Sequence, residues 1–414
     1  MQTAPPAAPF AVLPDLASRQ SGGSVVGAND ELFAERENLI NPAPAEFRPY
    51  TFGPKGQIMD GWETRRRRET GYDWAVVRLG TAGVIRGVIV DTAFFIGNYP
   101  PFCSVEAAAV EPLGAQPTAV ELAEADWHEI VPRSALKGDT ANPFEVASEL
   151  RFTHVRLNIF PDGGVARLRV HGEALPDPRW ALDTDRDLAA LENGGRVLDC
   201  SNRFYSSPDN ILRSGPARVM GEGWETSRRR DDGNDWAVVQ LAAQAEIDRI
   251  EIDTTCFVGN AAGSARVTGC DATAADPEHP DSWFELLPRT RLEPDTVHRF
   301  RLDRTAVRRP VSRVRLDIFP DGGLARFRVH GSPTAAGRAA IFRTWADRLP
   351  ETALLQQLTG FAGAEADAVA QLVAARPFGS DDKALTAAVA RLLASAPLAG
   401  DERAAAAWRA LTGV

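Results

Sequence analysis

GWETRRRRETGYDWAVVRL, residues 61–79, returns as GWETSRRRDDGNDWAVVQL at residues 223–241. A second stretch, RLNIFPDGGVARLRVHG at 156–172, returns as RLDIFPDGGLARFRVHG at 315–331, with 14 of 17 residues identical. What both copies retain is either the scaffold of a fold or a site that is built twice.

The separation between matched residues is nearly constant along the chain. It is 162 positions between Trp62 and Trp224, and 159 positions between Phe160 and Phe319. Small steps in an otherwise constant separation indicate two homologous domains that differ in loop length.

Composition narrows the class of protein. A chain of 414 residues suits two or three domains. The net charge of −10 leaves no basic excess to neutralise phosphates, so no nucleic-acid partner is expected. No apolar run is long enough for a membrane span, no secretory signal is visible, and the four cysteines form no CxxC pair. These features predict a cytoplasmic protein with reduced thiols.

Composition shifts divide the chain into five predicted parts. They are a loosely attached arm at 1–21, a first repeat at 22–173, a linker at 174–186, a second repeat at 187–332 and a helical C-terminal extension at 333–414. In the extension, apolar residues recur at helical spacing over 338–349, 351–359, 364–375 and 382–394.

Each repeat has the pattern of a β domain. Short segments rich in β-branched residues, such as Asp73–Leu79 and Val84–Val90, predict strands, with counterparts at 235–241 and 247–252. The FPDGG segment that starts at Phe160 predicts a hairpin turn, and Arg167 and Arg169 are expected on one sheet face. The fold class predicted is mainly β, with a sandwich or jelly roll in each repeat.

Charged side chains are dense in the 61–79 block. Arginine forks suit a carboxylate or ureido ligand, because two parallel N–H groups match two oxygens. The alternative is a solvated strand face paired with acids. Since the block keeps its residue types in both copies, we favour a functional role. The four tryptophans are predicted to be core anchors; they are Trp62, Trp74, Trp224 and Trp236.

Other polar residues recur at strand ends. Asp91 and Asn98 flank a turn that could face a pocket, although an Asx turn explains Asp91 equally well. A turn role is predicted for Asp162, and a structural hydrogen-bonding role for His171. No histidine or cysteine pattern of a zinc site, no GxSxG, no P-loop and no GxGxxG occurs, whereas a divalent metal held by carboxylates stays open.

The chain resembles the allantoicase family. The matching pieces are MDGWETRRRR (59–68), YDWAVVRLG (72–80), VDTAFFIGNYPP (90–101) and NIFPDGG (158–164), and their order and repetition cover residues 22–332. The resemblance implies two tandem jelly-roll domains of the galactose-binding type. It also implies hydrolysis of allantoate to ureidoglycolate and urea in purine degradation, with no cofactor expected, and we expect a homo-oligomer.

The implied chemistry suggests roles for the recurring residues. Urea leaves intact, so a carbon–nitrogen bond breaks and acid–base assistance is needed. The acid–base candidates are Glu63 and Asp73, and the substrate-binding candidates are Arg66, Arg67, Asp91 and Asn98. The possible second-repeat counterparts are Glu225, Asp235, Arg228, Arg229, Asp253 and Asn260.

The second copy is less faithful to the family pattern. Asp60 becomes Glu222, and the Tyr-Pro-Pro at 99–101 becomes Ala-Ala-Gly at 261–263. Whether one or both repeats are catalytic therefore stays open. In one alternative, the second repeat only builds an oligomer interface.

Three further alternatives concern function and the tail. The chain could be a non-catalytic binding module, or it could act on a related compound such as ureidoglycolate. ARPFGS (375–380) and SAPLAG (395–400) resemble part of a decarboxylase that acts earlier in urate breakdown. Because that family has histidine where Ala396 stands, decarboxylase activity is not expected, and an ordinary alanine-rich helical appendage is the other interpretation.

Overall fold

The computed structural model describes residues 8–110, 117–178, 186–303, 309–358, 366–378 and 387. The chain divides into two compact units: Met1–Leu175 with Arg348–Gln357, and Pro176–Asp347 with Leu358–Val414. Each unit contains one β-rich repeat, so the mainly β class with two tandem sandwich domains and a helical C-terminal part is confirmed. Among the described residues, no helix is long and apolar enough to span a membrane.

The first repeat is built around one long strand, β5 (Asp73–Asp91). Its other strands are β1 (Ser24–Ala28), β2 (Phe52–Gly53), β3 (Gly56–Gln57), β4 (Trp62–Glu63), β6 (Phe102–Ala108), β7 (His128–Ala135), β8 (Ala141–Glu145), β9 (Arg151–Phe160), β10 (Gly164–Val165) and β11 (Arg167–Ala174). Short helices are η1 (Pro9–Val12), η2 (Arg19–Ser21), η3 (Arg36–Ile40) and α1 (Ala119–Ala123). All the pairings are antiparallel, in the order β1-β5-β9-β6-β7, and β8 and β11 also pair with β5.

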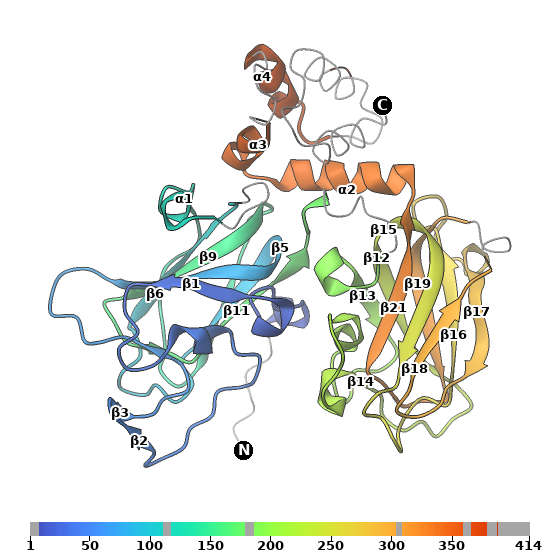
Figure 1. Ribbon diagram of the computed structural model, residues 1–414, viewed down its shortest axis with the longest axis horizontal. Coiled ribbons are helices and arrows are strands. Elements are labelled where there is room, and N and C mark those ends of the chain that lie inside the picture. Colours follow the sequence, from blue (N-terminus) through green and yellow to red (C-terminus); the bar gives the residue numbers. More distant parts are fainter. Residues whose placement is uncertain are drawn as a thin grey trace. The chain divides into compact units, whose positions relative to one another are not determined.

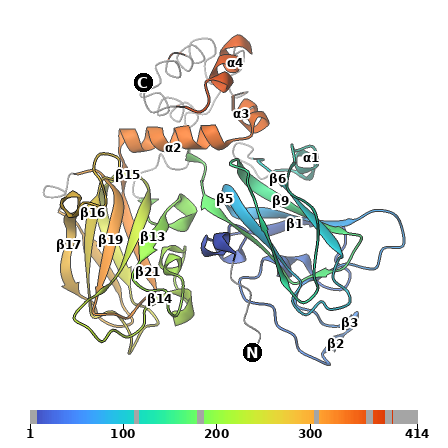
Figure 2. The ribbon, with the colours of Figure 1, turned by 180° about the vertical axis from the view of Figure 1, so that it is seen from behind.

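Strand β5 takes part in two groups of strands, where the sequence predicted two separate short strands. Its first half pairs with β1 and β9, and its second half pairs with β11 and β8. The register shifts between Arg78 and Gly83, where the strand passes from one group to the other. Gly80 and Gly83 lie between the two predicted strands, and both permit close approach of a neighbouring backbone. Strands β5 and β9 lie side by side in both views (Figure 1, Figure 2).

The predicted hairpin at Phe160 is wrong. Strands β9 and β11 do not pair with each other, because each pairs with a different half of β5. The turn between them forms β10, which pairs with β4 instead. Gly163 has a φ of 142°, and a Cβ there would lie 2.7 Å from the carbonyl oxygen of Asn98. The turn therefore serves to bring the 61–64 and 98–100 segments together.

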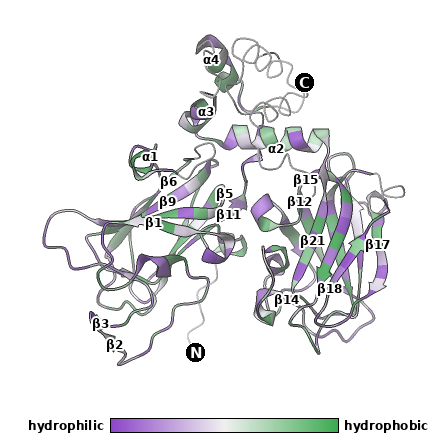
Figure 3. Ribbon diagram, viewed as in Figure 1, coloured by the Kyte–Doolittle hydropathy of each residue, from purple (hydrophilic) through white to green (hydrophobic). Residues whose placement is uncertain are grey.

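The second repeat follows the same plan around β15 (Asp235–Asp253). Its strands are β12 (Arg186–Asp187), β13 (Arg196–Cys200), β14 (Trp224–Glu225), β16 (Ser264–Cys270), β17 (Phe284–Arg291), β18 (Val297–Arg301), β19 (Val311–Phe319), β20 (Gly323–Leu324) and β21 (Arg326–Pro333). Its 3-10 helices are η5 (Leu191–Asn193), η6 (Pro208–Leu212), η7 (Met220–Glu222) and η8 (Pro280–Ser282). Buried and half-buried residues alternate along most of β21, and Figure 3 shows the corresponding alternation of hydropathy.

Each repeat has its own apolar core. Trp62 and Trp224 are fully buried, and their indole N–H groups donate to the carbonyl oxygens of Asp30 (2.8 Å) and Asn202 (2.9 Å). For these two tryptophans the prediction of a core anchor is confirmed. Trp74 and Trp236 are only half-buried, so the core prediction is wrong for them.

The N-terminal segment is attached more firmly than predicted. Leu16 and Ala17 are buried in the first core, and the Leu16 N–H donates to the carbonyl oxygen of Val170 at 2.7 Å. Asp15 accepts the Val170 N–H at 3.0 Å. The described part of the predicted loose arm is therefore an integral edge of the first repeat.

Three of the predicted C-terminal helices are present as α2 (Ala335–Arg348), α3 (Glu351–Leu358) and α4 (Ala366–Ala374). The fourth, predicted at 382–394, lies outside the described residues apart from position 387. The segments 379–380 and 395–400, which carry most of the decarboxylase resemblance, also lie outside them.

Candidate active site

Three segments that precede or follow the long strands meet at one place: strand β4, the loop at Asn98 and the turn at residues 163–164. Strand β4 pairs with β10, so that Glu63 lies opposite Gly164. The N–H of Gly164 donates to the carbonyl oxygen of Asn98 at 2.8 Å, and the N–H of Thr64 donates to that of Gly163 at 3.1 Å. Ala34 bonds the backbone of Glu63 from the other side, at 3.2 Å in both directions. The backbone of Glu63 is thus held on both edges.

Glu63 and Asn98 form the central side-chain pair. The Asn98 Nδ2 donates to the Glu63 Oε1 at 2.7 Å. Burial raises the pKa of the Glu63 carboxyl, and the hydrogen bond from Asn98 opposes that rise. A half-buried carboxyl that favours its neutral form can donate a proton to a bound ligand.

The loop that carries Asn98 is rigidly built. Phe94 has a positive φ of 67°, a conformation that costs energy for a bulky residue. Asp139 accepts the Phe94 N–H at 2.8 Å, and the Thr92 hydroxyl donates to the carbonyl oxygen of Lys137 at 2.6 Å. These bonds from the 137–140 segment hold the strained loop, and with it Asn98, in place.

Asp73 and Arg67 form a pair below the loop surface. The carboxylate of Asp73, only 1 % exposed, accepts from Arg67 at 2.7 Å and from Asn29 at 3.0 Å. The backbone N–H of Arg67 donates to Asp162 at 2.8 Å. Since Arg67 is engaged and Asp73 is enclosed, this pair shapes the loop between them.

The remaining first-repeat candidates differ in their surroundings. Asp91 accepts the N–H of Ala93 at 2.9 Å, which is the Asx turn considered above. Arg66 is exposed and has no hydrogen bond or ion pair to any residue that the structure describes. Arg66 is therefore a free guanidinium close in sequence to Glu63, whereas Arg67 is not.

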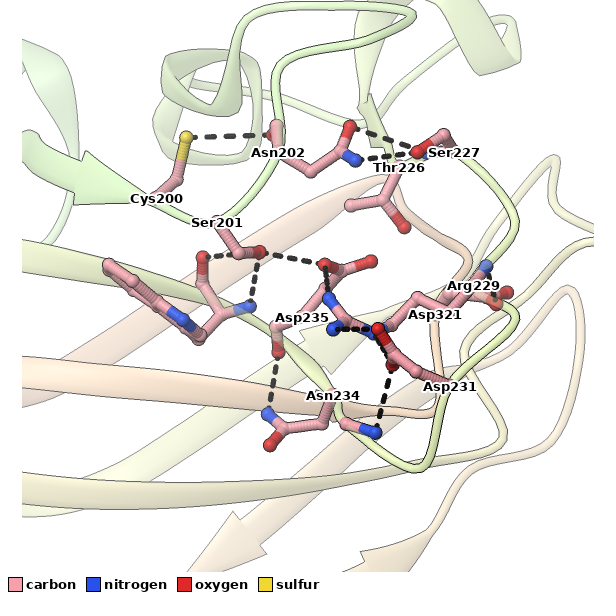
Figure 4. A network of polar contacts seen from close by, with 12 residues as sticks. Cys200, Ser201, Asn202, Thr226, Ser227, Arg229, Asp231, Asn234, Asp235 and Asp321 are labelled. Atoms are coloured by element: carbon pink, nitrogen blue, oxygen red, sulfur yellow. Dashed lines mark hydrogen bonds and ion pairs between the residues drawn. The ribbon is translucent and has the colours of Figure 1, made fainter.

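The second repeat builds the same arrangement. Asn260 donates to Glu225 at 2.7 Å, and Arg229 donates to Asp235 at 2.9 Å. Figure 4 shows the buried Asp235 also accepting from the hydroxyl of Ser201, at 2.8 Å. Asp321 accepts the Arg229 N–H at 2.7 Å, as Asp162 accepts that of Arg67. Asp253 accepts the Thr255 N–H at 2.7 Å in a matching Asx turn, and Arg228 is exposed like Arg66. All six predicted pairs of counterparts occupy corresponding places.

Sequence reasoning missed Asn29, which supports both Asp73 and the backbone of Trp74. Ser201 performs the same function in the second repeat. In the sequence, the only indication of this role would have been that both repeats carry a polar residue at the matched position, Asn29 in the first and Ser201 in the second. Both residues lie outside the repeated blocks quoted above. The structural role predicted for His171 agrees with its contact to the carbonyl oxygen of Leu13 at 2.7 Å.

No group of three or more His, Cys, Asp or Glu side chains that could hold a metal ion occurs among the residues that the structure describes. The central pair consists of the Glu63 carboxyl, whose pKa is raised by burial, and the Asn98 amide, and the exposed Arg66 follows three residues after Glu63 in the chain. The fold defines a protein of two tandem β-sandwich repeats, each with a paired glutamate and asparagine at the same place.

Comparison with known proteins identifies the family. The model of the Allantoicase repeat matches residues 14–175 and 186–334. A probable allantoicase of Nocardia farcinica is 54 % identical over 323 residues, which cover 78 % of this chain and 95 % of the relative. One from Streptomyces avermitilis is 52 % identical over 345 residues, covering 80 % and 89 %. The chain belongs to the allantoicase family.

A solved structure supports the same assignment. The crystal structure of allantoicase from Saccharomyces cerevisiae aligns with a TM-score of 0.64 and 36 % identity, covering 77 % of this chain and 92 % of that one. The resemblance to the allantoicase family is therefore confirmed, whereas none of these comparisons supports the decarboxylase resemblance of the tail.

Proposed function

We propose that the chain hydrolyses allantoate to ureidoglycolate and urea, and that Glu63 in the first repeat carries the chemistry. Family membership at more than half identity supports the reaction. One observation supports Glu63 as the residue that carries the chemistry. Its carboxyl is half-buried, burial raises its pKa, and Asn98 orients it.

The first step is departure of urea from the central carbon of allantoate. The carbon–nitrogen bond breaks, its electron pair stays on the leaving nitrogen, and the neutral Glu63 carboxyl donates a proton to that nitrogen. The nitrogen of the remaining ureido group shares its lone pair with the carbon, which becomes an iminium. The substrate carboxylate on the same carbon offsets this positive charge.

The second step is addition of water to the iminium carbon. Glu63, now a carboxylate, removes a proton from the water as its oxygen bonds to the carbon. The product is ureidoglycolate, and Glu63 returns to its neutral form. One carboxyl therefore performs both proton transfers in sequence, so a second titratable group is not required.

The neighbouring residues have supporting roles in this proposal. Arg66 binds the substrate carboxylate, because its guanidinium is exposed and unengaged among the described residues. Asp73, predicted as an acid or base, is assigned a positioning role instead, because it is buried against Arg67. Asp91 shapes the turn that leads to Asn98.

The test is urea release from allantoate by matched variants. Glu63→Gln is expected to lower kcat by about 10²- to 10⁴-fold, the range typical for loss of a general acid or base. Glu225→Gln removes the matching carboxyl of the second repeat and is expected to retain activity. A Glu63→Gln protein that turns over normally while folded would exclude this placement, and loss only in Glu225→Gln would move the site to the second repeat.

We also propose that the protein is a cytoplasmic homo-oligomer without a nucleic-acid partner. The charge of −10 supports the last point. Exposed apolar side chains such as Tyr205 and Val219 offer surface for subunit contacts. Light scattering of the purified protein would give the number of subunits.

A further inference from the structure

The two repeats differ most in the segment that precedes Glu63. In the first repeat, residues 41–61 connect η3 to Trp62, whereas residues 213–223 connect η6 to Trp224 in the second. The ten additional residues of the first repeat carry the small hairpin of β2 and β3. Figure 1 shows this hairpin projecting from the first repeat. We call residues 41–60 the flap.

The base of the flap is fastened by a buried arginine. Arg167 donates to the carbonyl oxygen of Ala43 at 3.0 Å and to the carboxylate of Asp60 at 2.7 Å. The same carboxylate accepts the N–H of Glu46 at 2.9 Å. The two ends of the flap are thus joined to each other and to β11.

The second repeat keeps the bonds from the buried arginine to backbone carbonyls, but no bond from that arginine to a carboxylate is found among its described residues. Its buried Arg326 donates to the carbonyl oxygens of Gly215 and Glu222, both at 2.8 Å. The carboxylate of Glu222, however, is engaged by Arg218 at 2.6 Å. The arginine to acid pair at the base of the flap therefore belongs to the first repeat.

The flap exposes apolar side chains that its own chain does not cover. Tyr50 is 89 % exposed, Phe52 68 % and Ile58 54 %. Scattered exposed apolar residues are ordinary, but three on one short projecting segment indicate a binding surface.

The position of the flap indicates what it binds. The ring of Phe47 stacks on that of Phe94 with centroids 5.8 Å apart, and Phe94 belongs to the loop that carries Asn98. At its other end the flap runs through Gly61 and Trp62 directly into Glu63. It therefore borders both members of the central pair.

We propose that the flap closes over substrate bound at Glu63 and Asn98, and that its aromatic side chains cover the planar ureido groups of allantoate. Closure excludes bulk water and strengthens the interactions of the carboxyl with its ligand. This inference rests on the function proposed above. It makes the first repeat the catalytic one, because the second repeat lacks the flap.

A chimera tests the flap without removing Glu63. Residues 41–60 are replaced by the shorter second-repeat connection, residues 213–222, which the same fold already accommodates. The expected result is a loss in kcat/KM of about 100-fold, as for a misplaced substrate, with unchanged melting temperature and subunit number. The matched control is Phe204→Ala, which removes an exposed aromatic ring from the second repeat and is expected to leave turnover unchanged.

Limited proteolysis supplies a second readout. The flap contains two basic residues, and the Arg48 peptide bond is followed by proline, so trypsin is expected to cut after exposed Lys55. In the Glu63→Gln protein, millimolar allantoate is expected to slow cleavage after Lys55 several-fold.

The outcomes are distinguishable. A chimera with normal turnover, or cleavage that allantoate does not slow, would overturn the flap proposal. A chimera that loses subunits together with activity would also overturn it, because the flap would then be an oligomer contact. Normal turnover by Glu63→Gln would instead exclude Glu63 as the acid, and folded protein with the native sequence that releases no urea from allantoate would disprove the proposed function.

Discussion

Glu63 and Glu225 make the same hydrogen bond to an asparagine, at 2.7 Å in both repeats. Burial raises the pKa of the Glu63 carboxyl. A carboxyl with a raised pKa remains protonated to higher pH, and this is the form that the departure of urea requires.

This gives a prediction for the pH profile. The pKa of Glu63 lies above the ordinary 4.5, so kcat/KM is expected to fall on the alkaline side at a pH above that value. Asn98→Ala removes the hydrogen bond that favours the carboxylate. We therefore expect its alkaline limb to move to higher pH, while its maximal rate falls because Glu63 loses its orientation.

The control for this prediction is Asn260→Ala, which removes the matching amide from the second repeat and is expected to leave the pH profile in place. Steady-state urea release measured across pH provides the data. An alkaline limb that moves down in Asn98→Ala would contradict the assignment of Glu63 as the acid.

At the scale of elements, the site depends on β5 taking part in two groups of strands. Its first half pairs with β9, which leads into the FPDGG turn, and its second half leads into the loop of Asn98. Strand β11 fixes the second half, and its register shifts at Gly172. A Cβ at Gly172 would lie 2.3 Å from the carbonyl oxygen of Val84, and one at Gly331 would lie 2.2 Å from that of Glu246.

Gly172→Ala is therefore expected to destabilise the first repeat by about 1–3 kcal/mol, because the backbone of β5 must shift. Gly221→Ala is the control, since nothing lies within 4 Å of its added Cβ. Urea denaturation followed by circular dichroism measures both variants. Equal stability of the two would show that β5 and β11 separate at little cost.

At the scale of the whole molecule, the two repeats have separate apolar cores. One core is drawn from residues 16–170 and the other from residues 188–329, and no residue belongs to both. We propose that each repeat is a folding unit of its own, and that the first unit includes Leu16 and Ala17 of the N-terminal segment.

Matched core substitutions test this proposal. Val77 and Val239 are both fully buried at corresponding places. Val77→Ala and Val239→Ala are each expected to cost about 2 kcal/mol through lost burial and a residual cavity. Scanning calorimetry is expected to show two transitions, each lowered by one variant only. One transition lowered equally by both would mean that the repeats unfold together.

Much of the fold followed from local patterns. Repetition revealed two domains, and β-branched segments revealed where strands run. The hairpin at Phe160 and the break within β5 were predicted wrongly, because glycine and proline permit turns but do not specify which strands pair. For the N-terminal segment, a Pro/Ala-rich composition did not reveal that Leu16 packs into a core.

By itself, the sequence determined the family, the tandem β class and the residue types of the site, because these depend on composition, order and repetition. Only the tertiary structure decided their roles. It enclosed Asp73 with Arg67, left Arg66 free and joined Glu63 to Asn98 across 35 positions of chain. Burial and hydrogen bonding set the pKa of a carboxyl, and both arise from segments that sequence spacing does not bring together.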